Sequence, residues 1–434
     1  MSCDAQHLWN FSLRHLRQLR QPYGFAASEA ETGIYNALFG RDSLWTLLFL
    51  LEAQRLAAID GFDDWLESAA RDIIGALVAH QGQHFNDAIE EQPGKIIHEY
   101  RETTDQRLEQ MGLVFEKGRS YAGFDQTFLF VIAIGVLARS SRLGAIAAEA
   151  WPAFEQALNW IVSCADHDGD RLFEYERKDG RNLLHQSWRD SFDSATIAGA
   201  DIPQQPVAWL SVQAYAYMAL GEAAALYARR GDDDKARQFG ARAHELQRKV
   251  HATFWIDLED CYAIGLDGAK RMIPMVSSDA GHALWAGIAD PVCEPKLVQR
   301  LLRPDMLTAY GLRTLSSASP AFCPFAYHRG NTWPFDNAVF VMALLRRGHL
   351  AEARRVIEGV AAAVFTIGAP IELYVVLDQP LFVKPQVEVE HVLLMRRQNQ
   401  ENRIQSWTAA ALAYMAAVLA WMRDMRLEYN DGQT

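Results

Sequence analysis

One loop segment combines a carboxylate with large aromatic rings. Asp190 stands in QSWRDSFD (186–193), with Trp188 and Phe192 on either side. A carboxyl beside large rings loses solvation, which raises its pKa and suits a general acid. Asp193 is the competing candidate for this role. A loop whose aspartates cap a helix explains the segment equally well.

A second carboxylate stands alone in an apolar stretch. Glu372 lies within GAPIELY (368–374), which carries no other charge. Burying an unpaired carboxylate is costly. Glu372 is therefore either ion-paired or a catalytic base, and its residue type alone favours neither.

Polar and aromatic residues recur where buried helices are predicted to begin. They lie in NALFGRDS (36–43), YAGFDQT (121–127), YHRGNTWPFDN (327–337) and QSW (405–407). The candidate pocket residues, counting Trp188 of the loop above, are Arg41, Asp42, Tyr121, Asp125, Trp188, His328, Trp333 and Trp407. Such residues at the same end of successive helices predict a polar pocket with aromatic walls.

The elements that must position these residues are mostly helices. Nearly all-apolar segments alternate with two-faced ones. The expected inner helices are 42–58, 126–140, 206–230, 279–288, 333–347 and 403–423. The expected outer helices are 63–81, 143–164, 233–254, 294–302, 350–365 and one near 7–19, which pairs with the last inner helix. About six such pairs predict an all-α fold, an (α/α)6 toroid whose pocket lies at one end of the inner ring.

We expect one catalytic domain over 1–434, because no Pro-, Gly- or Ser-rich linker divides the chain. A solenoid or two bundles are the alternative helical folds. A solenoid needs a repeat of fixed period, which the sequence lacks. Between the helices we expect a long polar loop at 82–121, a short hairpin around 172–175, and a second hairpin from 371–377 and 387–394.

Composition excludes several classes of function. The 434 residues carry a formal charge of −12, and half of them are apolar. The acidic balance argues against nucleic acid or an anionic membrane as partner. The longest apolar runs, 44–51 and 127–138, are too short to span a membrane. Five scattered cysteines and no visible signal peptide favour a cytoplasmic protein.

The sequence predicts neither a metal nor a cofactor. The run DHDGDR (166–171) looks like a calcium loop, but Arg171 stands where an EF-hand requires glycine and Arg177 where it requires glutamate. A turn is the better interpretation. The scattered cysteines show no zinc-ligand spacing.

Taken together, these segments resemble the amylo-α-1,6-glucosidase type of (α/α)6 glycoside hydrolase, which includes the glucosidase half of glycogen-debranching enzymes. Mannosylglycerate and glucosylglycerate hydrolases are more distant relatives of that group. The matching stretches are FGRDSLW (39–45), GKIIHEYR (94–101), YAGFDQT (121–127), QSWRDSFDS (186–194), LDGAKR (266–271), SDAGHALWAGI (278–288), GLRTLSS (311–317), YHRGNTWPFDNA (327–338), IEL (371–373) and QSWTAAA (405–411). They occur in the family's order over most of the chain.

The resemblance implies an inverting, exo-acting α-glucosidase that needs no cofactor. It assigns the general acid to Asp190 and the general base to Glu372. It also implies sugar contacts at Arg41, Asp42, Trp188, His328, Trp333 and Trp407. The segment before Trp407 is longer than usual and rich in charge, which leaves Glu390 and Glu401 as rival bases. Many relatives carry an N-terminal β-domain that this sequence lacks, so a short carbohydrate such as glucosylglycerate is expected instead of glycogen.

Two other functions remain open. Sugar 2-epimerases are also (α/α)6 toroids and use histidines as acid and base; His98, His282, His328 and His391 could serve in this way. A non-catalytic helical scaffold would present a flat or apolar central face, which the polar helix starts argue against. Four cations in the matching loops could recognise a carboxylate or phosphate or simply be surface charges: Arg101, Lys270, Arg271 and Arg313. The sequence does not predict an oligomeric state.

Overall fold

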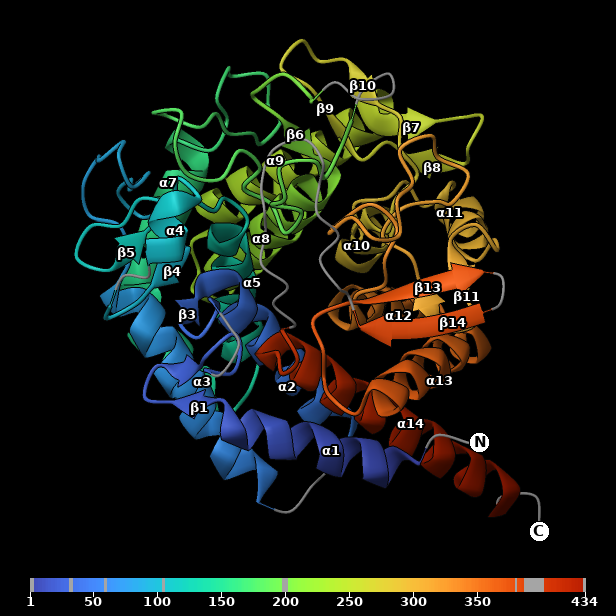
Figure 1. The fold of residues 1–434 in the computed structure, drawn as a ribbon. Helices are drawn as coiled ribbons and strands as arrows, with labels where there is room; N and C mark the ends of the chain where they lie inside the picture. Colours follow the sequence, from blue (N-terminus) through green and yellow to red (C-terminus); the bar gives the residue numbers. More distant parts are fainter. Residues whose placement is uncertain are drawn as a thin grey trace.

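The computed structural model describes residues 4–30, 34–57, 61–103, 106–196, 202–378, 381–385 and 402–431 (Figure 1). Helices dominate it. In chain order they are α1 (Ala5–Gln18), α2 (Gly40–Leu56), α3 (Phe62–Ala79), α4 (Gln106–Gln110), α5 (Gln126–Ala138), α6 (Gly144–Glu149), α7 (Trp151–Ser163), α8 (Leu210–Arg229), α9 (Asp233–Phe254), α10 (Asp279–Ala286), α11 (Glu294–Leu301), α12 (Pro334–Arg346), α13 (Leu350–Ile367) and α14 (Ser406–Asp431).

Alternate helices form a closed ring. Going round it, α2 packs on α5, α5 on α8, α8 on α10, α10 on α12, α12 on α14, and α14 returns to α2. A second set of helices lies outside this ring: α3 against α2, α6 and α7 against α5, α9 against α8, α11 against α10, α13 against α12, and α1 against α14. The predicted (α/α)6 toroid is confirmed, including its closure by the first and last helices.

Side-chain patterning explains which helices lie inside. Within α5, every residue from Gln126 to Gly135 is buried, because neighbours surround the helix on all sides. The outer helix α9 buries one stripe only, namely Phe239, Ala243, Leu246, Val250 and Phe254. These positions recur every three or four residues, which is one face of a helix.

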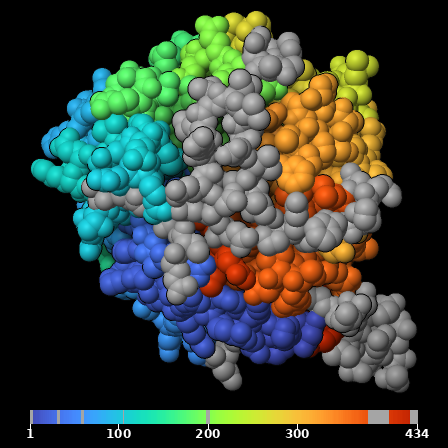
Figure 2. Space-filling model, viewed as in Figure 1, coloured from blue at the N-terminus to red at the C-terminus, as the bar shows by residue number. Residues whose placement is uncertain are grey.

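Short antiparallel strands connect the helices. They pair as β1 (Arg20–Gln21) with β2 (Gly24–Phe25), β3 (Leu38–Phe39) with β4 (Glu99–Tyr100) with β5 (Arg119–Ser120), β6 (Ala208–Trp209) with β9 (Gly265–Leu266) with β10 (Met272–Ile273), β7 (Trp255–Ile256) with β8 (Cys261–Tyr262), β11 (Leu307–Thr308) with β12 (Gly311–Leu312), and β13 (Tyr374–Asp378) with β14 (Leu381–Pro385). In the space-filling view, the blue-to-cyan and the orange parts of the chain lie on opposite sides of one face (Figure 2).

Two predicted helices differ from the structure. The continuous helix over 143–164 is wrong: it divides into α6 and α7, because Pro152 stands in the first turn of α7 and lacks the N–H that a continuous helix would use. The helix predicted from 206 begins only at Leu210, since Ala208 and Trp209 pair with β9.

The hairpin predictions are confirmed only in part. No hairpin forms at 172–175, where Tyr175 makes a single bridge to Val207. The strand predicted at 371–377 corresponds to β13, but its partner is β14; residues 387–394 lie outside the described residues. Within the described part of the chain, none of the helices combines the length and apolar character needed to cross a membrane.

Candidate active site

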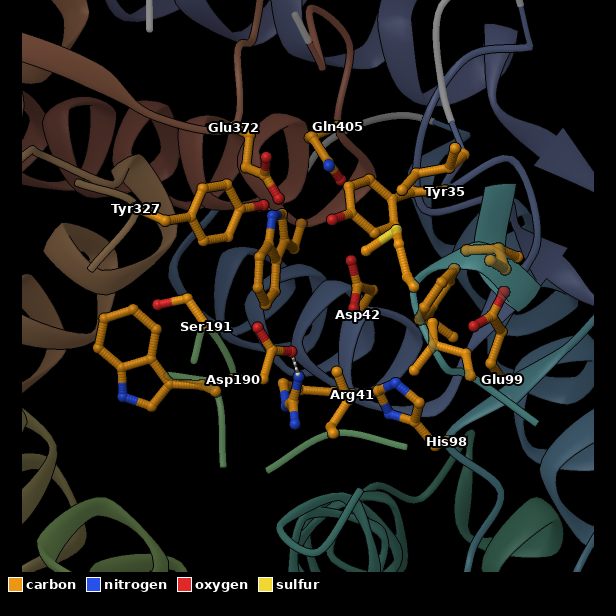
Figure 3. Close-up of a pocket in the computed structure, with 18 of the residues that line it drawn as sticks. Tyr35, Arg41, Asp42, His98, Glu99, Asp190, Ser191, Tyr327, Glu372 and Gln405 are labelled. Atoms are coloured by element: carbon orange, nitrogen blue, oxygen red, sulfur yellow. Dashed lines mark hydrogen bonds and ion pairs between the residues drawn. The ribbon is translucent and has the colours of Figure 1, made fainter. Parts of the chain in front are cut away.

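A pocket opens where the inner helices begin. Seven of the ten predicted site residues line it: Arg41, Asp42, Trp188, Asp190, Trp333, Glu372 and Trp407. They come from the first turns of α2 and α14, from the residue before α12, and from two loops. Segments separated by more than 300 residues in sequence therefore meet at one polar, aromatic-walled site (Figure 3).

The other three predicted residues lie behind the pocket wall. Tyr121 is buried and donates its hydroxyl hydrogen to the carbonyl of His80 at 2.9 Å. Asp125 is fully buried against Arg41, and His328 is hydrogen-bonded to Ser191 at 2.8 Å. Asp125 and His328 thus hold the wall residues Arg41 and Ser191 in place, and none of the three side chains lines the pocket.

Strand pairing fixes the position of Arg41. The β3–β4 pair leads into α2, and Gly40 donates its N–H to the carbonyl of His98 at 2.9 Å. A side chain at Gly40 would meet the carbonyl oxygen of Ile97, so only glycine fits there. Arg41 then donates to both carboxylate oxygens of Asp125, at 2.8 and 2.9 Å, and to Asp190 at 3.0 Å.

The loop that carries Asp190 is attached to the toroid through its neighbour Arg189. Arg189 and Asp279, the first residue of α10, form an ion pair in which both side chains are 0% exposed. Arg189 also donates to the carbonyls of His328 and Thr314, each at 2.8 Å. This buried anchor fixes the backbone immediately before Asp190.

The expected aromatic enclosure of Asp190 is wrong on one side. Trp188 is buried and lines the pocket, whereas Phe192 is 47% exposed and does not. Asp190 itself remains 26% exposed and is paired with Arg41. The alternative acid, Asp193, is bound by Arg329 at 2.8 Å and is not a lining residue.

Glu372 is buried and held by two donors. The amide of Asn402 donates to its carboxylate at 2.7 Å, and Tyr327 donates from its phenol hydroxyl. Burial raises the pKa of Glu372 to about 8, although these two hydrogen bonds favour the charged form. The rival bases Glu390 and Glu401 lie outside the described residues.

In Figure 3, Glu372 lies with Tyr327 and Gln405 along one edge of the pocket, and Asp190 lies with Arg41 along the other. Asp42 lies between these edges. Burial raises the pKa of Asp42 to about 7, opposed by the charge of Arg41.

Sequence reasoning missed several lining residues. Glu99 is one, and burial raises its pKa to about 7 against the opposing charge of Arg101. Tyr35, Ser191, Tyr327 and Gln405 also line the pocket. Among these five residues, all but Tyr35 lie inside a segment that the resemblance had already matched.

The aromatic residues form a connected wall. Trp333 lies 5.8 Å from Trp407, centroid to centroid, and at 80° to it. Trp188 lies 5.8 Å from Trp333 at 78°. The indole N–H of Trp188 donates to Asp279 at 3.1 Å, which fixes the ring orientation. Apolar ring faces beside carboxylates suit a pyranose, which offers C–H faces and hydroxyl edges.

The histidines needed for an epimerase are not gathered at the pocket. Of the histidines that the structure describes, only His98 lines it; burial, reinforced by the nearby charge of Arg41, holds the pKa of His98 well below its usual value. His282 is fully buried and hydrogen-bonded to Tyr215 at 2.7 Å and to Asp336 at 2.8 Å. His391 lies outside the described residues. The geometry therefore does not favour paired histidine acid–base chemistry.

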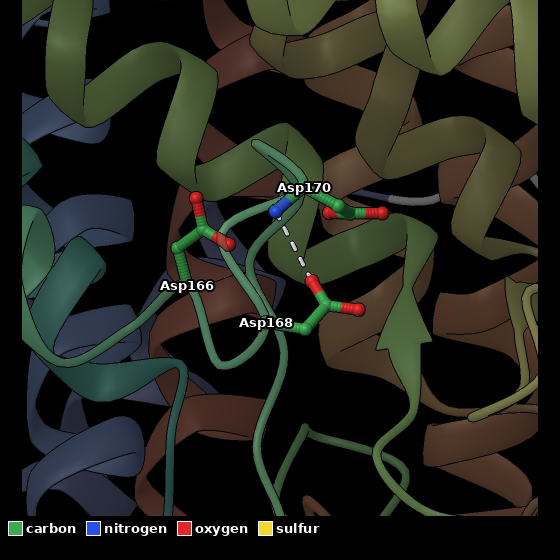
Figure 4. Close-up of side chains that lie close together, drawn as sticks. All are labelled: Asp166, Asp168 and Asp170. Atoms are coloured by element: carbon green, nitrogen blue, oxygen red, sulfur yellow. Dashed lines mark hydrogen bonds between the residues drawn. The ribbon is translucent and has the colours of Figure 1, made fainter.

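A lysine side chain contacts the carboxylates of the aspartate-rich turn at 166–171. Ligand oxygens of Asp166, Asp168 and Asp170 lie within 4.8 Å of one another (Figure 4). The ammonium group of Lys270 lies 2.9 Å from Asp168, 3.1 Å from Asp170 and 2.6 Å from Glu174. The lysine already supplies the positive charge, and the backbone N–H of Asp170 donates to Asp168 as expected for a turn.

The remaining predicted cations are also engaged by protein groups and do not line the pocket. Arg271 pairs with Asp267 at 2.7 Å, and Arg101 pairs with Glu99. Arg313 is buried and donates to the carbonyl of Pro304 at 3.3 Å. None of these arginines, nor Lys270, lines the pocket.

Comparisons with known proteins agree with this geometry. Residues 114–372 match the family described as the mannosylglycerate hydrolase MGH1-like glycoside hydrolase domain. No curated protein matches the sequence. The family match confirms a glycosidase, but it does not single out the amylo-α-1,6-glucosidase type on which the resemblance centred.

Solved structures share the fold at low sequence identity. A GH63 mannosylglycerate hydrolase from Thermus thermophilus in complex with Tris aligns with a TM-score of 0.68 and 15% identity, over 94% of this chain and 99% of that one. The same hydrolase is also known in complex with Tris and D-glycerate. A rhamnosidase from Klebsiella oxytoca with rhamnose bound aligns with a TM-score of 0.56 and 15% identity, over 94% of this chain and 63% of that one.

Proposed function

The chain belongs to the MGH1-like glycoside hydrolase family, and from this premise we propose that it removes a terminal sugar from a short α-glycoside with inversion at the anomeric carbon. Asp190 is the general acid and Glu372 the general base. The observation that carries the proposal is that these two carboxyls line one aromatic-walled pocket and come from different loops. Most glycoside hydrolases use a pair of Asp or Glu carboxyls that flank the glycosidic bond.

The chemistry proceeds in one displacement. Asp190 donates its proton to the glycosidic oxygen as the bond from that oxygen to the anomeric carbon breaks. Glu372 removes a proton from a water molecule as the water oxygen bonds to the same carbon from the opposite face. Room for that water requires carboxyls about 6.5–9.5 Å apart.

The pair works while it holds one proton. Burial raises the pKa of Glu372 to about 8, and the charge of Asp190 contributes to this shift. Arg41, 3.0 Å from Asp190, favours the ionised form of Asp190. Hydrolysis requires the opposite arrangement, in which Asp190 carries the proton and Glu372 is ionised. Both arrangements contain one proton. Activity therefore follows the titration of the pair and not of one residue.

The remaining lining residues suit binding of one sugar ring. Asp42 and Glu99 are buried acceptors for hydroxyl groups, and Trp333 and Trp407 offer ring faces. An α-glucoside is the substrate that the sequence resemblance favours, and mannosylglycerate is the substrate in the name of the similar Thermus hydrolase. The proposed substrate class is therefore a short α-glucoside or α-mannoside.

Hydrolysis of a panel of short α-glucosides and α-mannosides, followed by proton NMR, tests this proposal. The first-formed sugar should be the β-anomer, which then equilibrates. The α-anomer as first product, or no hydrolysis of any member, would contradict the proposal. Glycosyl fluorides should be included, because they report sugar recognition without an aglycone.

A further inference from the structure

The charges that line the pocket are strongly unbalanced. Among the described residues, the ionisable groups on its wall, tyrosines aside, are Arg41, Asp42, His98, Glu99, Asp190 and Glu372. Four of these six are carboxyls and one is an imidazole. A guanidinium is the single permanent cation among them.

That cation, Arg41, already binds protein groups. Arg41 contacts both oxygens of Asp125 at 2.8 and 2.9 Å, Asp190 at 3.0 Å and the carbonyl of Ser187 at 2.8 Å. Its side chain is 4% exposed, so it has little surface left for a ligand. His98 does not replace it, because burial and neighbouring arginines keep its pKa well below neutral.

A second arginine, Arg101, contacts the pocket wall from behind and does not line the pocket. Arg101 is mostly buried, and its guanidinium lies 6.0 Å from the ring centroid of the lining residue Phe39. It donates to the carboxylate of Glu99 and to the carbonyl of Ile34. Glu99 lines the pocket and presents its own carboxylate there, so the wall carries an acid in front of the arginine.

We propose that the pocket selects glycosides with an uncharged aglycone, and that Glu99 enforces this selection by binding Arg101. The inference rests on the proposed glycosidase function and specifies its substrate. An anionic aglycone such as glycerate would lose its hydration beside Asp42, Glu99, Asp190 and Glu372, and the described residues offer it no free cationic partner on the pocket wall. A hydroxylated neutral aglycone, such as glycerol or a second sugar, can donate hydrogen bonds to the same acceptors.

Two substrates that differ at one aglycone carbon, a hydroxymethyl group in one and a carboxylate in the other, test the proposal. They are the 2-O-α-glycosides of glycerol and of glycerate with the same sugar, glucose or mannose, and the glycosyl fluoride serves as a reference without an aglycone. Measurements belong at pH 8 in a buffer without Tris, since Glu99 is mostly ionised there. We expect kcat/KM for the glycerol conjugate to exceed that for the glycerate conjugate by at least about tenfold, from like-charge repulsion in a partly buried site.

The Glu99→Gln variant tests the assigned residue. It removes one negative charge and releases Arg101, so the preference for the neutral conjugate should fall at least about fivefold relative to wild type. Asp64→Asn, an exposed change of equal charge on the outer helix α3, should leave the preference unchanged. A general loss of structure would lower both rates together and leave their ratio unchanged.

The outcomes separate this inference from the proposed function. Turnover of the fluoride with a preference for the glycerate conjugate would overturn the inference alone. Turnover of the fluoride without cleavage of either conjugate would also overturn it, because a neutral aglycone must fit. Loss of turnover on all three compounds would refute the glycosidase function, and the inference with it. An unchanged ratio in Glu99→Gln would remove Glu99 from the explanation.

Discussion

Replacing Asp279 by asparagine should be among the most destabilising changes of a single charge in this protein. Asp279 and Arg189 form an ion pair that is fully buried, so the substitution leaves a buried guanidinium without its counter-charge. Removing one partner of a buried pair costs about 3–5 kcal/mol. Asparagine can still accept the indole N–H of Trp188, so we expect a loss of about 3 kcal/mol, near the lower end of that range.

Urea unfolding followed by tryptophan fluorescence measures this loss, and Asp267→Asn is the matched control. The Asp267 side chain is equally buried, but its partner Arg271 is 63% exposed and stays hydrated when the acid is neutralised. We expect the control to cost about 1 kcal/mol or less. Equal shifts of the unfolding midpoint in the two variants would refute the argument. In the folded fraction of Asp279→Asn, kcat should also fall, because Arg189 precedes the proposed acid.

Three further results are expected. Burial raises the pKa of Glu372 to about 8 in the folded chain, against 4.5 for an ordinary glutamate, so the contribution of this carboxyl to wild-type stability is complete below about pH 4.5 and is lost as the pH rises through 8. Glu372→Gln should therefore gain stability relative to wild type from pH 5 to 8. Thermal unfolding curves whose difference does not grow with pH would contradict this. Asp193→Asn should keep near wild-type kcat, because Asp193 is bound by Arg329 outside the pocket; a loss of a hundredfold or more, on the order of a missing general acid, would make Asp193 the acid. Asn402→Ala removes a donor to the ionised form of Glu372 and should move the basic limb of the kcat/KM profile, where the pair loses its one proton, to higher pH. An unchanged basic limb would show that this carboxyl does not control it.

The helices could be predicted because burial leaves a strong pattern. An inner helix such as α5 is apolar on every face, whereas α9 alternates a buried stripe with charge. Proline often marks the first turn of a helix, so Pro152 does indicate the division between α6 and α7. The helical spacing of apolar residues continues on both sides of it and favours one continuous helix instead. Strands of two residues, such as β3, are too short to show any period, and their pairing depends on distant segments.

The site could be predicted by segment more easily than by side chain. Asp42 and Asp125 both lie next to the start of an inner helix, but only Asp42 lines the pocket, and Asp125 turns toward Arg41. Sequence position does not show which way such a side chain points. Glu99 was missed although it lies in a matched segment. Its proposed role depends on its ion pair with Arg101, which follows β4 two residues later, and the sequence does not show that pairing.

The most direct test of the central mechanism compares leaving groups in two variants. Asp190→Asn should lower kcat by roughly two to four orders of magnitude on a substrate with a poor leaving group, but far less on a glycosyl fluoride, which needs no protonation. Glu372→Gln should be slow on both, because the attacking water always needs its base. An Asp190→Asn variant that is equally slow on both substrates, or a fully active Glu372→Gln variant, would contradict the assignment of these two carboxyls.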